Sequence, residues 1–284
     1  MKYEDIYNRL QTDGYYFGTF DDFWQEDQDG ITKVEFDKAV DFFKSTEPNM
    51  ETDYTYRHNY IDQNQCHFLK DPNYTGPIPT EEDLAHDVPY SRRHVRKKFV
   101  EDIIAGGANS RTTQQWAVAG FQNGQEMCDT FNTLTKSFVS KIYKFLEPVK
   151  NDLVLAPQYS IYKKEDFSEI HYDGMRKSRA CAIVYYFSDP ATYKDTSGGR
   201  FVIEKTDQYN AQLRDNPKLL TEMIEQKHSA LDYQVPVYGN YVMMDFLNHN
   251  PGHAIECVYD DFIRFAQITF VGVPGSDKEV FVND

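Results

Sequence analysis

The stretch SEIHYDGMRKSRACAIVYYF (168–187) decides the fold that we expect for this chain. Its second half, ACAIVYYF (180–187), is rich in β-branched and aromatic residues, which favour a buried strand. Its first half is a shorter strand that ends at Ile170 and runs into the turn HYDG (171–174). This composition predicts that the second half of the chain is built from β-strands.

Further short runs of the same composition lie on both sides of this stretch, separated by Gly, Pro, Asp and Asn. They are QYSIY (158–162), RFVIE (200–204), YVMMDF (241–246), HAIECV (253–258) and FIRFAQITF (262–270). Asn216-Pro217 is a helix-start signal, so a helical insertion is expected near 205–235. Residues 151–284 are therefore expected to form a β-sandwich or barrel with one helical insertion.

The first 150 residues follow a different pattern. Helical spacing predicts a short helix over 3–13 and a helix over 91–105 that carries a basic run. The clearest helix is expected over 124–147, ended by Pro148, and its apolar stripe consists of Met127, Phe131, Leu134, Phe138, Ile142 and Phe145. Residues 47–90 have no sustained periodicity and are predicted to be long loops. We therefore expect a single α+β domain over 1–284, in which a helical and loop-rich N-terminal half (1–150) supports the β core.

Composition excludes several classes of protein. The chain has 284 residues and a net charge of −15, which disfavours a nucleic-acid-binding protein. No apolar stretch approaches the roughly 18 residues of a membrane span, and the N-terminus MKYEDIYNRL is too charged for a signal peptide. The four cysteines are sparse and lack CxxC spacing, so reduced thiols and a cytoplasmic location are expected. The sequence leaves the oligomeric state open.

The turn at 171–174 carries the strongest chemical signal. Residues i and i+2 of an extended chain project from one face, so His171 and Asp173 can reach the same point. His253 begins a later β run, 80 residues beyond Asp173. Two histidines and one carboxylate form the facial triad that holds non-haem Fe(II) and leaves open coordination positions. The rival for the last ligand is His249, which lies among turn residues.

Arg264 stands in an otherwise apolar run. Strand alternation places it on one face with Phe262, Ala266 and Ile268. A guanidinium on an apolar face needs an anionic partner, and its planar fork suits a carboxylate.

In this order, over residues 155–273, the motifs resemble those of the Fe(II)- and 2-oxoglutarate-dependent oxygenases, in their prolyl-4-hydroxylase-like branch. The similar segments are SRACAIVYYFSDP (178–190), SGGRFVI (197–203), YGNYVMMDF (238–246) and the two runs that carry His253 and Arg264. The chain departs from the branch at Glu165, where a glycine is frequent, and in the lengthened gap between Asp173 and His253.

The resemblance implies a double-stranded β-helix (jelly roll) core that uses Fe(II), 2-oxoglutarate and O2. His171, Asp173 and His253 would hold the metal, Arg264 would pair with the far carboxylate of 2-oxoglutarate, and Tyr162 would contact it. The implied reaction hydroxylates a C–H bond and releases succinate and CO2. Halogenating relatives lack the motif's carboxylate, so the presence of Asp173 favours hydroxylation. The expected substrate is amino-acid-like or peptidyl, possibly prolyl, under a lid within 47–90.

Two other classes remain open at this point. One is a non-catalytic, metal-binding, cupin-like β-barrel protein, which would use the same three ligands. The other is a structural or interaction protein in which the histidines are accidental. Arg264 discriminates against the first class, because a structural metal site does not need a buried guanidinium.

Overall fold

The computed structural model describes residues 2–45, 50–51, 96–97, 124–164, 166–173, 179–215 and 217–273. Most of the predicted loops at 47–90, with the expected lid, and most of the predicted 91–105 helix lie outside the described residues. No helix in these ranges is long and apolar enough to cross a membrane.

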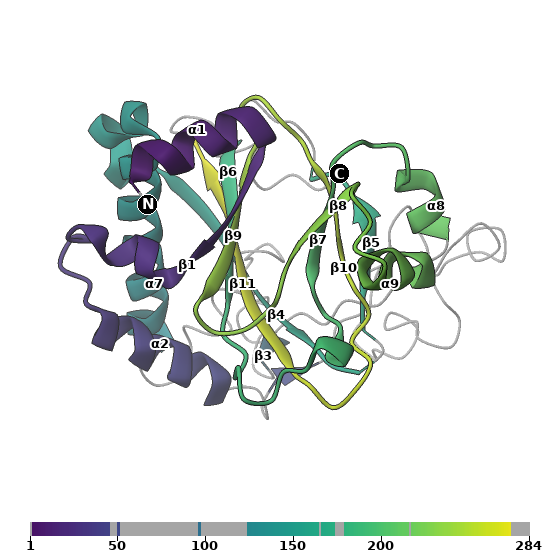
Figure 1. Cartoon of the computed structure of the whole chain (residues 1–284). Helices are drawn as coiled ribbons and strands as arrows, with labels where there is room; N and C mark the ends of the chain where they lie inside the picture. The colour runs from purple at the N-terminus through teal and green to yellow at the C-terminus, as the bar shows by residue number, and fades with distance from the viewer. Residues whose placement is uncertain are drawn as a thin grey trace, which may run out of the picture.

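Two antiparallel sheets form the centre of the structure (Figure 1). The larger sheet has the strand order β1-β9-β6-β11-β4, and the smaller has the order β5-β10-β7-β8. The bounds of the larger sheet are β1 Tyr15–Thr19, β4 Val154–Tyr162, β6 Arg179–Tyr186, β9 Asn240–Asp245 and β11 Arg264–Gly272. Those of the smaller are β5 Ser168–His171, β7 Phe201–Glu204, β8 Leu231–Gln234 and β10 Gly252–Ile255. The expected combination of helices with antiparallel sheet is confirmed.

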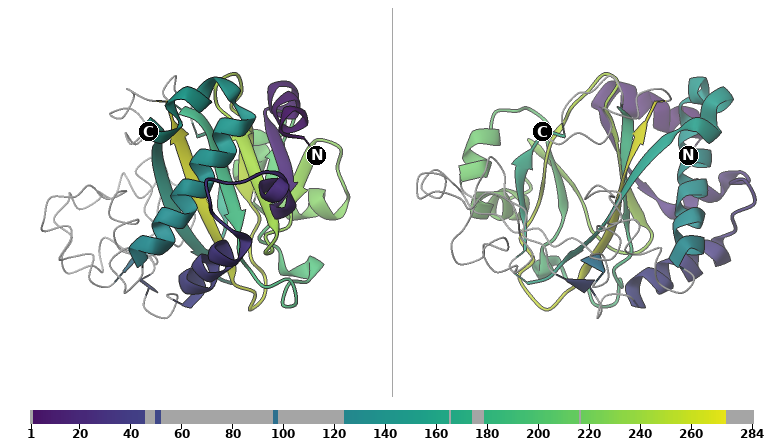
Figure 2. Two further views of the ribbon diagram at one scale, coloured as in Figure 1. Left: turned by 90° about the vertical axis from the view of Figure 1, so that its left-hand side faces the viewer. Right: turned by 180° about the vertical axis from the view of Figure 1, so that it is seen from behind.

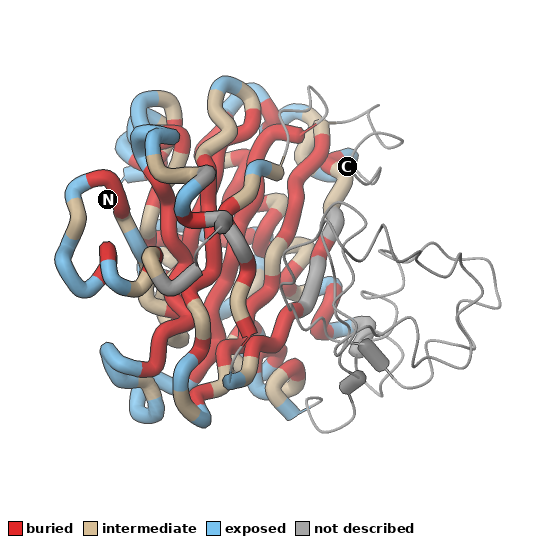
Figure 3. Tube along the Cα trace, turned by 90° about the vertical axis from the view of Figure 1, so that its right-hand side faces the viewer, coloured by how far each residue is buried: buried red, intermediate tan, exposed pale blue. Residues whose placement is uncertain are grey.

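Alternate side chains of one strand point to opposite faces of its sheet and so belong to different apolar cores. In β6, Ala182, Val184 and Tyr186 belong to the core that also contains Phe201 and Ile203 of the smaller sheet. The intervening residues of β6 belong to a second core, with the N-terminal helices. Figure 3 shows the result as buried strands whose connecting loops carry most of the exposed positions. The space between the sheets is therefore a packed interior lined from both sides.

Three helices cover the outer face of the larger sheet (Figure 2). They are α1 Tyr3–Asp13, α2 Lys33–Ser45 and α7 Gly124–Ile142. Their apolar faces meet β6 and β9 through residues such as Ile6, Phe36 and Phe138, which are fully buried. The 3–13 helix is confirmed, and it ends at Gly14 in a left-handed conformation, as the Asp13-Gly14 turn indicated.

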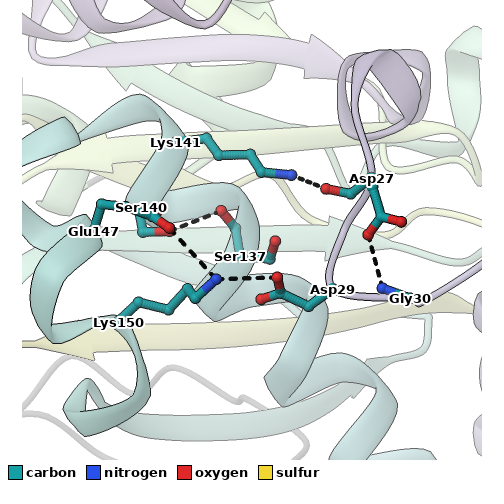
Figure 4. A network of polar contacts seen from close by, with 8 residues as sticks. All are labelled: Asp27, Asp29, Gly30, Ser137, Ser140, Lys141, Glu147 and Lys150. Atoms are coloured by element: carbon teal, nitrogen blue, oxygen red, sulfur yellow. Dashed lines mark hydrogen bonds and ion pairs between the residues drawn. The ribbon is translucent and has the colours of Figure 1, made fainter.

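Polar contacts join the chain between η1 (Phe20–Gln25) and α2 to α7 and to η3 (Lys144–Asp152) (Figure 4). Lys141 contacts the backbone carbonyl of Asp27, and Lys150 pairs with Asp29 at 3.0 Å. The Asp27 side chain in turn accepts a hydrogen bond from the Gly30 backbone at 2.8 Å. These contacts hold the segment between η1 and α2 against α7 and η3.

The predicted insertion contains two helices, α8 Asn210–Asp215 and α9 Pro217–Glu225. Leu213, Leu220 and Met223 pack on the outer face of the smaller sheet, against Val202 and Ala254. Most of the insertion therefore packs against the outer face of the smaller sheet, and only its first residues lie near the metal-ligand candidates.

Two details of the predicted helices are wrong. The 124–147 helix ends at Ile142, and Phe145, expected in its buried stripe, is 56% exposed. Pro148 has no N–H and its ring clashes with the carbonyl four residues earlier, at Lys144, so the helix must end before that residue. Arg96–Lys97 form the strand β3, paired with β2 Met50–Glu51, where a helix was expected. The basic run places like charges four residues apart, which disfavours a helix.

Candidate active site

The structure brings His171, Asp173 and His253 together at one end of the two-sheet interior. His171 ends β5, and its partner across the sheet is His253 near the start of β10. One ligand atom from each of the three residues lies within 4.8 Å of those of the other two. Asp173 Oδ2 is 3.3 Å from His253 Nε2, and Asp173 Oδ1 is 3.7 Å from His171 Nε2. No other group of three such ligands occurs in the described ranges.

Contacts around His253 select the ring nitrogen that faces the site. Its Nδ1 lies 3.0 Å from the carbonyl oxygen of Pro251, which makes Nδ1 the protonated nitrogen and assigns the ligand role to Nε2, the nitrogen that faces Asp173. The Phe201 ring stacks on the imidazole with centroids 5.3 Å apart. The ring of His253 is therefore held in place before any metal binds.

Asp173 is held as a carboxylate. Burial acts to raise its pKa, but the adjacent His253, and then His171 and Arg179, outweigh this effect and hold the pKa well below its usual range. Arg179 also donates from Nη1 to the Asp173 backbone carbonyl at 2.8 Å, while its guanidinium lies 4.5 Å from the centroid of the Phe270 ring. This arginine fixes the backbone of the turn that carries the ligand.

The rival ligand His249 faces away from this cluster. Its Nε2 lies 2.9 Å from the carbonyl oxygen of Gln11, at the end of α1. It packs against Gly14, where an added Cβ would come within 2.7 Å of the His249 side chain. His249 therefore joins the N-terminal helix to the chain before β10.

Arg264 lies deeper in the interior and is fully buried. Its Nε donates to the Gly199 carbonyl at 3.0 Å, and its guanidinium lies over the rings of Tyr162 (4.9 Å) and Tyr186 (5.2 Å). Within the described part of the chain, its two terminal nitrogens, Nη1 and Nη2, make no hydrogen bond of normal geometry, although the Tyr186 hydroxyl lies beside the guanidinium. A buried guanidinium with two unused donors fits the carboxylate of a bound anion. Phe262, Ala266 and Ile268 line the same interior, as alternation predicted.

Tyr162 is the direct cross-strand partner of Arg264 and is fully buried. Tyr186 and Ser160 complete the polar lining of this region, and neither was singled out from the sequence. The Tyr186 hydroxyl lies beside Arg264, and the buried Ser160 hydroxyl has no hydrogen-bond partner among the described residues. Alternation from Ala182 along β6 would have placed Tyr186 inside, and alternation from Tyr162 along β4 would have placed Ser160 there.

Two glycines allow the chain before β7 to approach Arg264. Gly198 and Gly199 have φ values of +72° and +71°, the left-handed region that favours glycine. A Cβ on Gly198 would lie 1.9 Å from the carbonyl oxygen of Cys257, so this position cannot accept a side chain without a shift of the backbone. The glycines in SGGRFVI therefore place the carbonyl that holds Arg264.

Two other buried arginines, Arg200 and Arg179, are already engaged. Arg200 is engaged by Glu256, with both carboxylate oxygens 3.2 Å from its Nη1. Arg179 holds the Asp173 turn. Arg264 therefore has the guanidinium best suited to an external anion.

The sequence matches no protein-family model and no curated protein. Among solved structures, a prolyl hydroxylase from Trichoplax adhaerens, in complex with a hypoxia-inducible factor oxygen degradation domain peptide fragment, aligns with 98% of this chain and 91% of its own. The identity is 8% and the TM-score 0.52. A prolyl-4-hydroxylase from Pseudomonas putida aligns with 96% of this chain and 100% of its own, at 12% identity and a TM-score of 0.50.

The residues present fit the cofactors that such a fold implies. The two histidines and the carboxylate form a suitable donor set for Fe(II), and the unused guanidinium nitrogens of Arg264 fit a dicarboxylate. Fold and donor set together support Fe(II), 2-oxoglutarate and O2 as cofactors. The chain has the fold of the prolyl-4-hydroxylase-like branch of the Fe(II)- and 2-oxoglutarate-dependent oxygenases.

Proposed function

We propose that this protein is an Fe(II)- and 2-oxoglutarate-dependent dioxygenase that hydroxylates a C–H bond of an amino-acid-like or peptidyl substrate. The observation that carries the proposal is the pairing of the His171, Asp173 and His253 cluster with a buried, incompletely satisfied Arg264 in one interior. Strands β4 to β11 alternate between the two sheets, except that β7 and β8 both lie in the smaller one, and this order supports a double-stranded β-helix, or jelly roll.

Each residue has a role that follows from its surroundings. His171, Asp173 and His253 would bind Fe(II), and His253 would do so through Nε2. Arg264 would hold the far carboxylate of 2-oxoglutarate, with Tyr162 at its side. When bound, the iron, 2-oxoglutarate and O2 supply the oxidative decarboxylation to succinate and CO2 that drives C–H hydroxylation. The apolar walls formed by Phe201, Ile203 and their neighbours limit the access of water to this region.

The substrate class is supported less directly. The Trichoplax adhaerens prolyl hydroxylase is in complex with a peptide fragment, which supports a peptide substrate here, proline-containing peptides included. A free amino acid-like molecule is the other member of the proposed class. The domain is proposed to be a single unit over 1–284, and the protein is proposed to act in the cytoplasm.

A non-catalytic, cupin-like metal protein is the competing function. It would account for the two histidines and the carboxylate equally well. It gives no role to Arg264, whose burial without a full set of partners carries a desolvation cost. The arginine therefore favours the dioxygenase.

Anaerobic titration with Fe(II) or Mn(II) tests the metal site. One metal ion per chain should bind, and His171→Ala should abolish tight binding. The matched control is His228→Ala, since His228 lies outside the cluster. Equal affinity in the wild type and the His171 variant would exclude the site.

Succinate release measures the reaction itself. Production of succinate from 2-oxoglutarate should rise above the substrate-free rate with one member of a panel of free amino acids and proline-containing peptides. It should be absent in the His171 variant. Tight metal binding without any 2-oxoglutarate binding or turnover would favour the cupin-like protein.

A further inference from the structure

A polar cavity of about 360 Å³, separate from the interior that holds Arg264, lies near the metal-ligand candidates. Three separate segments line it, with residues Thr12, Asp13, Tyr15, Ile203, Glu204, Lys205, Asp207, His249, Asn250 and Pro251. Two of these residues connect it to the candidate active site. Ile203 is the cross-strand partner of His253, and the Pro251 carbonyl accepts the His253 Nδ1 hydrogen bond. The cavity therefore borders the ends of the two strands that carry Ile203 and His253, with Glu204 on the face of β7 opposite to Ile203.

Carboxylates dominate the charge of this cavity. Asp13, Glu204 and Asp207 contribute three negative groups, against the single cation of Lys205. Lys205 is paired with Asp232 at 3.1 Å, and Asp13 with Arg9 at 3.9 Å, which leaves Glu204 and Asp207 as the two uncompensated charges of the described lining. The cavity therefore favours a positively charged occupant.

Hydrogen-bond accounting leads to the same conclusion independently. Glu204 is only 2% exposed, and its Oε1 accepts hydrogen bonds from the backbone and hydroxyl of Thr206. Among the described residues, its Oε2 is buried without a hydrogen-bond partner, and so is the Oδ1 of Asn250. Buried acceptors are rarely left without a donor. Two such acceptors along one cavity indicate an occupant that brings N–H groups.

Asp207 is fixed in place by the segment that carries two of the metal ligands. Its Oδ1 accepts from the Tyr172 hydroxyl at 2.8 Å and from Asn210 Nδ2 at 2.9 Å. Tyr172 stands between His171 and Asp173. A ligand contact at Asp207 would therefore be positioned relative to the metal turn.

The arrangement of the oxygens distinguishes an organic cation from a metal ion. Metal ligands must converge on one point, and in the described part of the chain only His171, Asp173 and His253 do so. The acceptors of this cavity are distributed along its wall. An ammonium or guanidinium at the end of a side chain, with several N–H donors, can reach separate oxygens.

We propose that this cavity is a substrate subsite for a cationic N–H donor group, the guanidinium or ammonium of an arginine- or lysine-like side chain. The proposal rests on the proposed function only in that the bound molecule is also the substrate of the oxygenase. It narrows the substrate from amino-acid-like molecules in general to those with a cationic side chain.

Calorimetric binding to the full-length protein, loaded with Mn(II) and 2-oxoglutarate, tests the subsite without turnover. The probes are Nα-acetyl-L-arginine amide, Nα-acetyl-L-lysine amide and the neutral Nα-acetyl-L-citrulline amide. At least one cationic probe should bind about tenfold or more tightly than the citrulline probe, as expected for hydrogen bonds to charged groups. Free L-arginine and free L-lysine form a further arm. Tighter binding of the capped probes assigns a peptide source, and tighter binding of the free amino acids assigns a small molecule.

Variants locate the binding. Glu204→Gln and Asp207→Asn should each weaken the preferred cationic probe about tenfold and leave the citrulline probe unchanged. Glu4→Gln, on the exposed side of α1, is the charge-matched control and should have no effect. Asp207 is exposed, so its variant keeps the test valid if the buried Glu204 variant fails to fold.

Equal affinity for the cationic and neutral probes would overturn the proposal. So would a cation preference that survives both variants. Binding of Mn(II) and 2-oxoglutarate is measured in the same samples, so failure of the dioxygenase proposal is registered separately from failure of the subsite.

Discussion

Substitution of Arg264 by methionine separates a ligand-binding guanidinium from a structural one. Removing one partner of a buried charge pair costs about 3–5 kcal/mol, which corresponds to about two to three and a half orders of magnitude in affinity. Arg264 is fully buried and is the residue best placed to neutralise an anion there. Arg264→Met should therefore weaken 2-oxoglutarate binding by at least about 100-fold and leave Mn(II) affinity nearly unchanged, as measured by anaerobic calorimetry.

The same variant should not destabilise the protein in the absence of 2-oxoglutarate. Burial of an uncompensated guanidinium costs several kcal/mol. Against this cost stand one hydrogen bond to Gly199, worth about 1.5–3 kcal/mol, and two ring contacts of about 0.5–2 kcal/mol each. These contributions nearly cancel, so the free energy of unfolding should change by less than about 2 kcal/mol. Added 2-oxoglutarate at 100 times its Kd should stabilise the wild type by about 2.7 kcal/mol, and the variant far less.

Arg200→Met is the matched control, because Arg200 is also buried but is paired with Glu256. Its loss should cost about 3–5 kcal/mol of folding stability, with or without 2-oxoglutarate, because it leaves a buried carboxylate unpaired. Denaturant unfolding of both variants, with and without 2-oxoglutarate, provides the comparison. If Arg264→Met behaves like Arg200→Met and still binds 2-oxoglutarate normally, the assignment of Arg264 is refuted.

Three other predictions concern the supporting structure. Gly198→Ala should lower the free energy of unfolding by more than the roughly 1–2 kcal/mol that a left-handed backbone costs, because the new Cβ would also meet the Cys257 carbonyl. Denaturant unfolding that gives the same free energy for the variant and the wild type would contradict this. Phe145→Ser should change stability by less than about 0.5 kcal/mol, whereas Phe138→Ala should cost about 3–5 kcal/mol, because Phe145 is exposed and Phe138 is fully buried. Iodoacetamide should modify Cys257 well before Cys181, since burial raises the pKa of the Cys181 thiol well above its usual value; peptide mapping that finds Cys181 modified first would show the reverse.

Local patterns explain how much of the candidate site could be predicted. The i and i+2 positions of His171 and Asp173 fix their relative directions wherever the strand lies, and alternation alone places Arg264 on the apolar face of its run. Each strand predicted after Pro148 is present, with bounds shifted by a few residues. The insertion was also found, because Pro217 is a strong helix-start signal.

Other features depend on partners that are distant in the sequence. β1 is a strand because it pairs with β9, so that Phe17 lies opposite Val242. Nothing within residues 15–19 specifies that partner. The same holds for Gly198, whose lack of a side chain matters only because the Cys257 carbonyl comes close to it. α2 was missed although its buried residues have helical spacing and Thr32 and Glu35 form a capping box at its start.

The basic Arg264 and the acidic cavity lie near opposite ends of β7. Gly199, just before the strand, accepts the hydrogen bond from Arg264, and Glu204 ends it beside the cavity. Glu204 points to the face of β7 opposite to Phe201 and Ile203, which share the interior with Tyr162 beside Arg264. Arg264 therefore cannot satisfy Glu204 by a direct contact. Under the proposed function, this separation directs an anionic co-substrate and a cationic substrate to opposite ends of the strand. Ile203, one residue before Glu204, pairs across the sheet with His253. The metal-ligand candidate His253 therefore lies near the end of β7 that borders the carboxylate-rich cavity, and the substrate would reach the metal from that end.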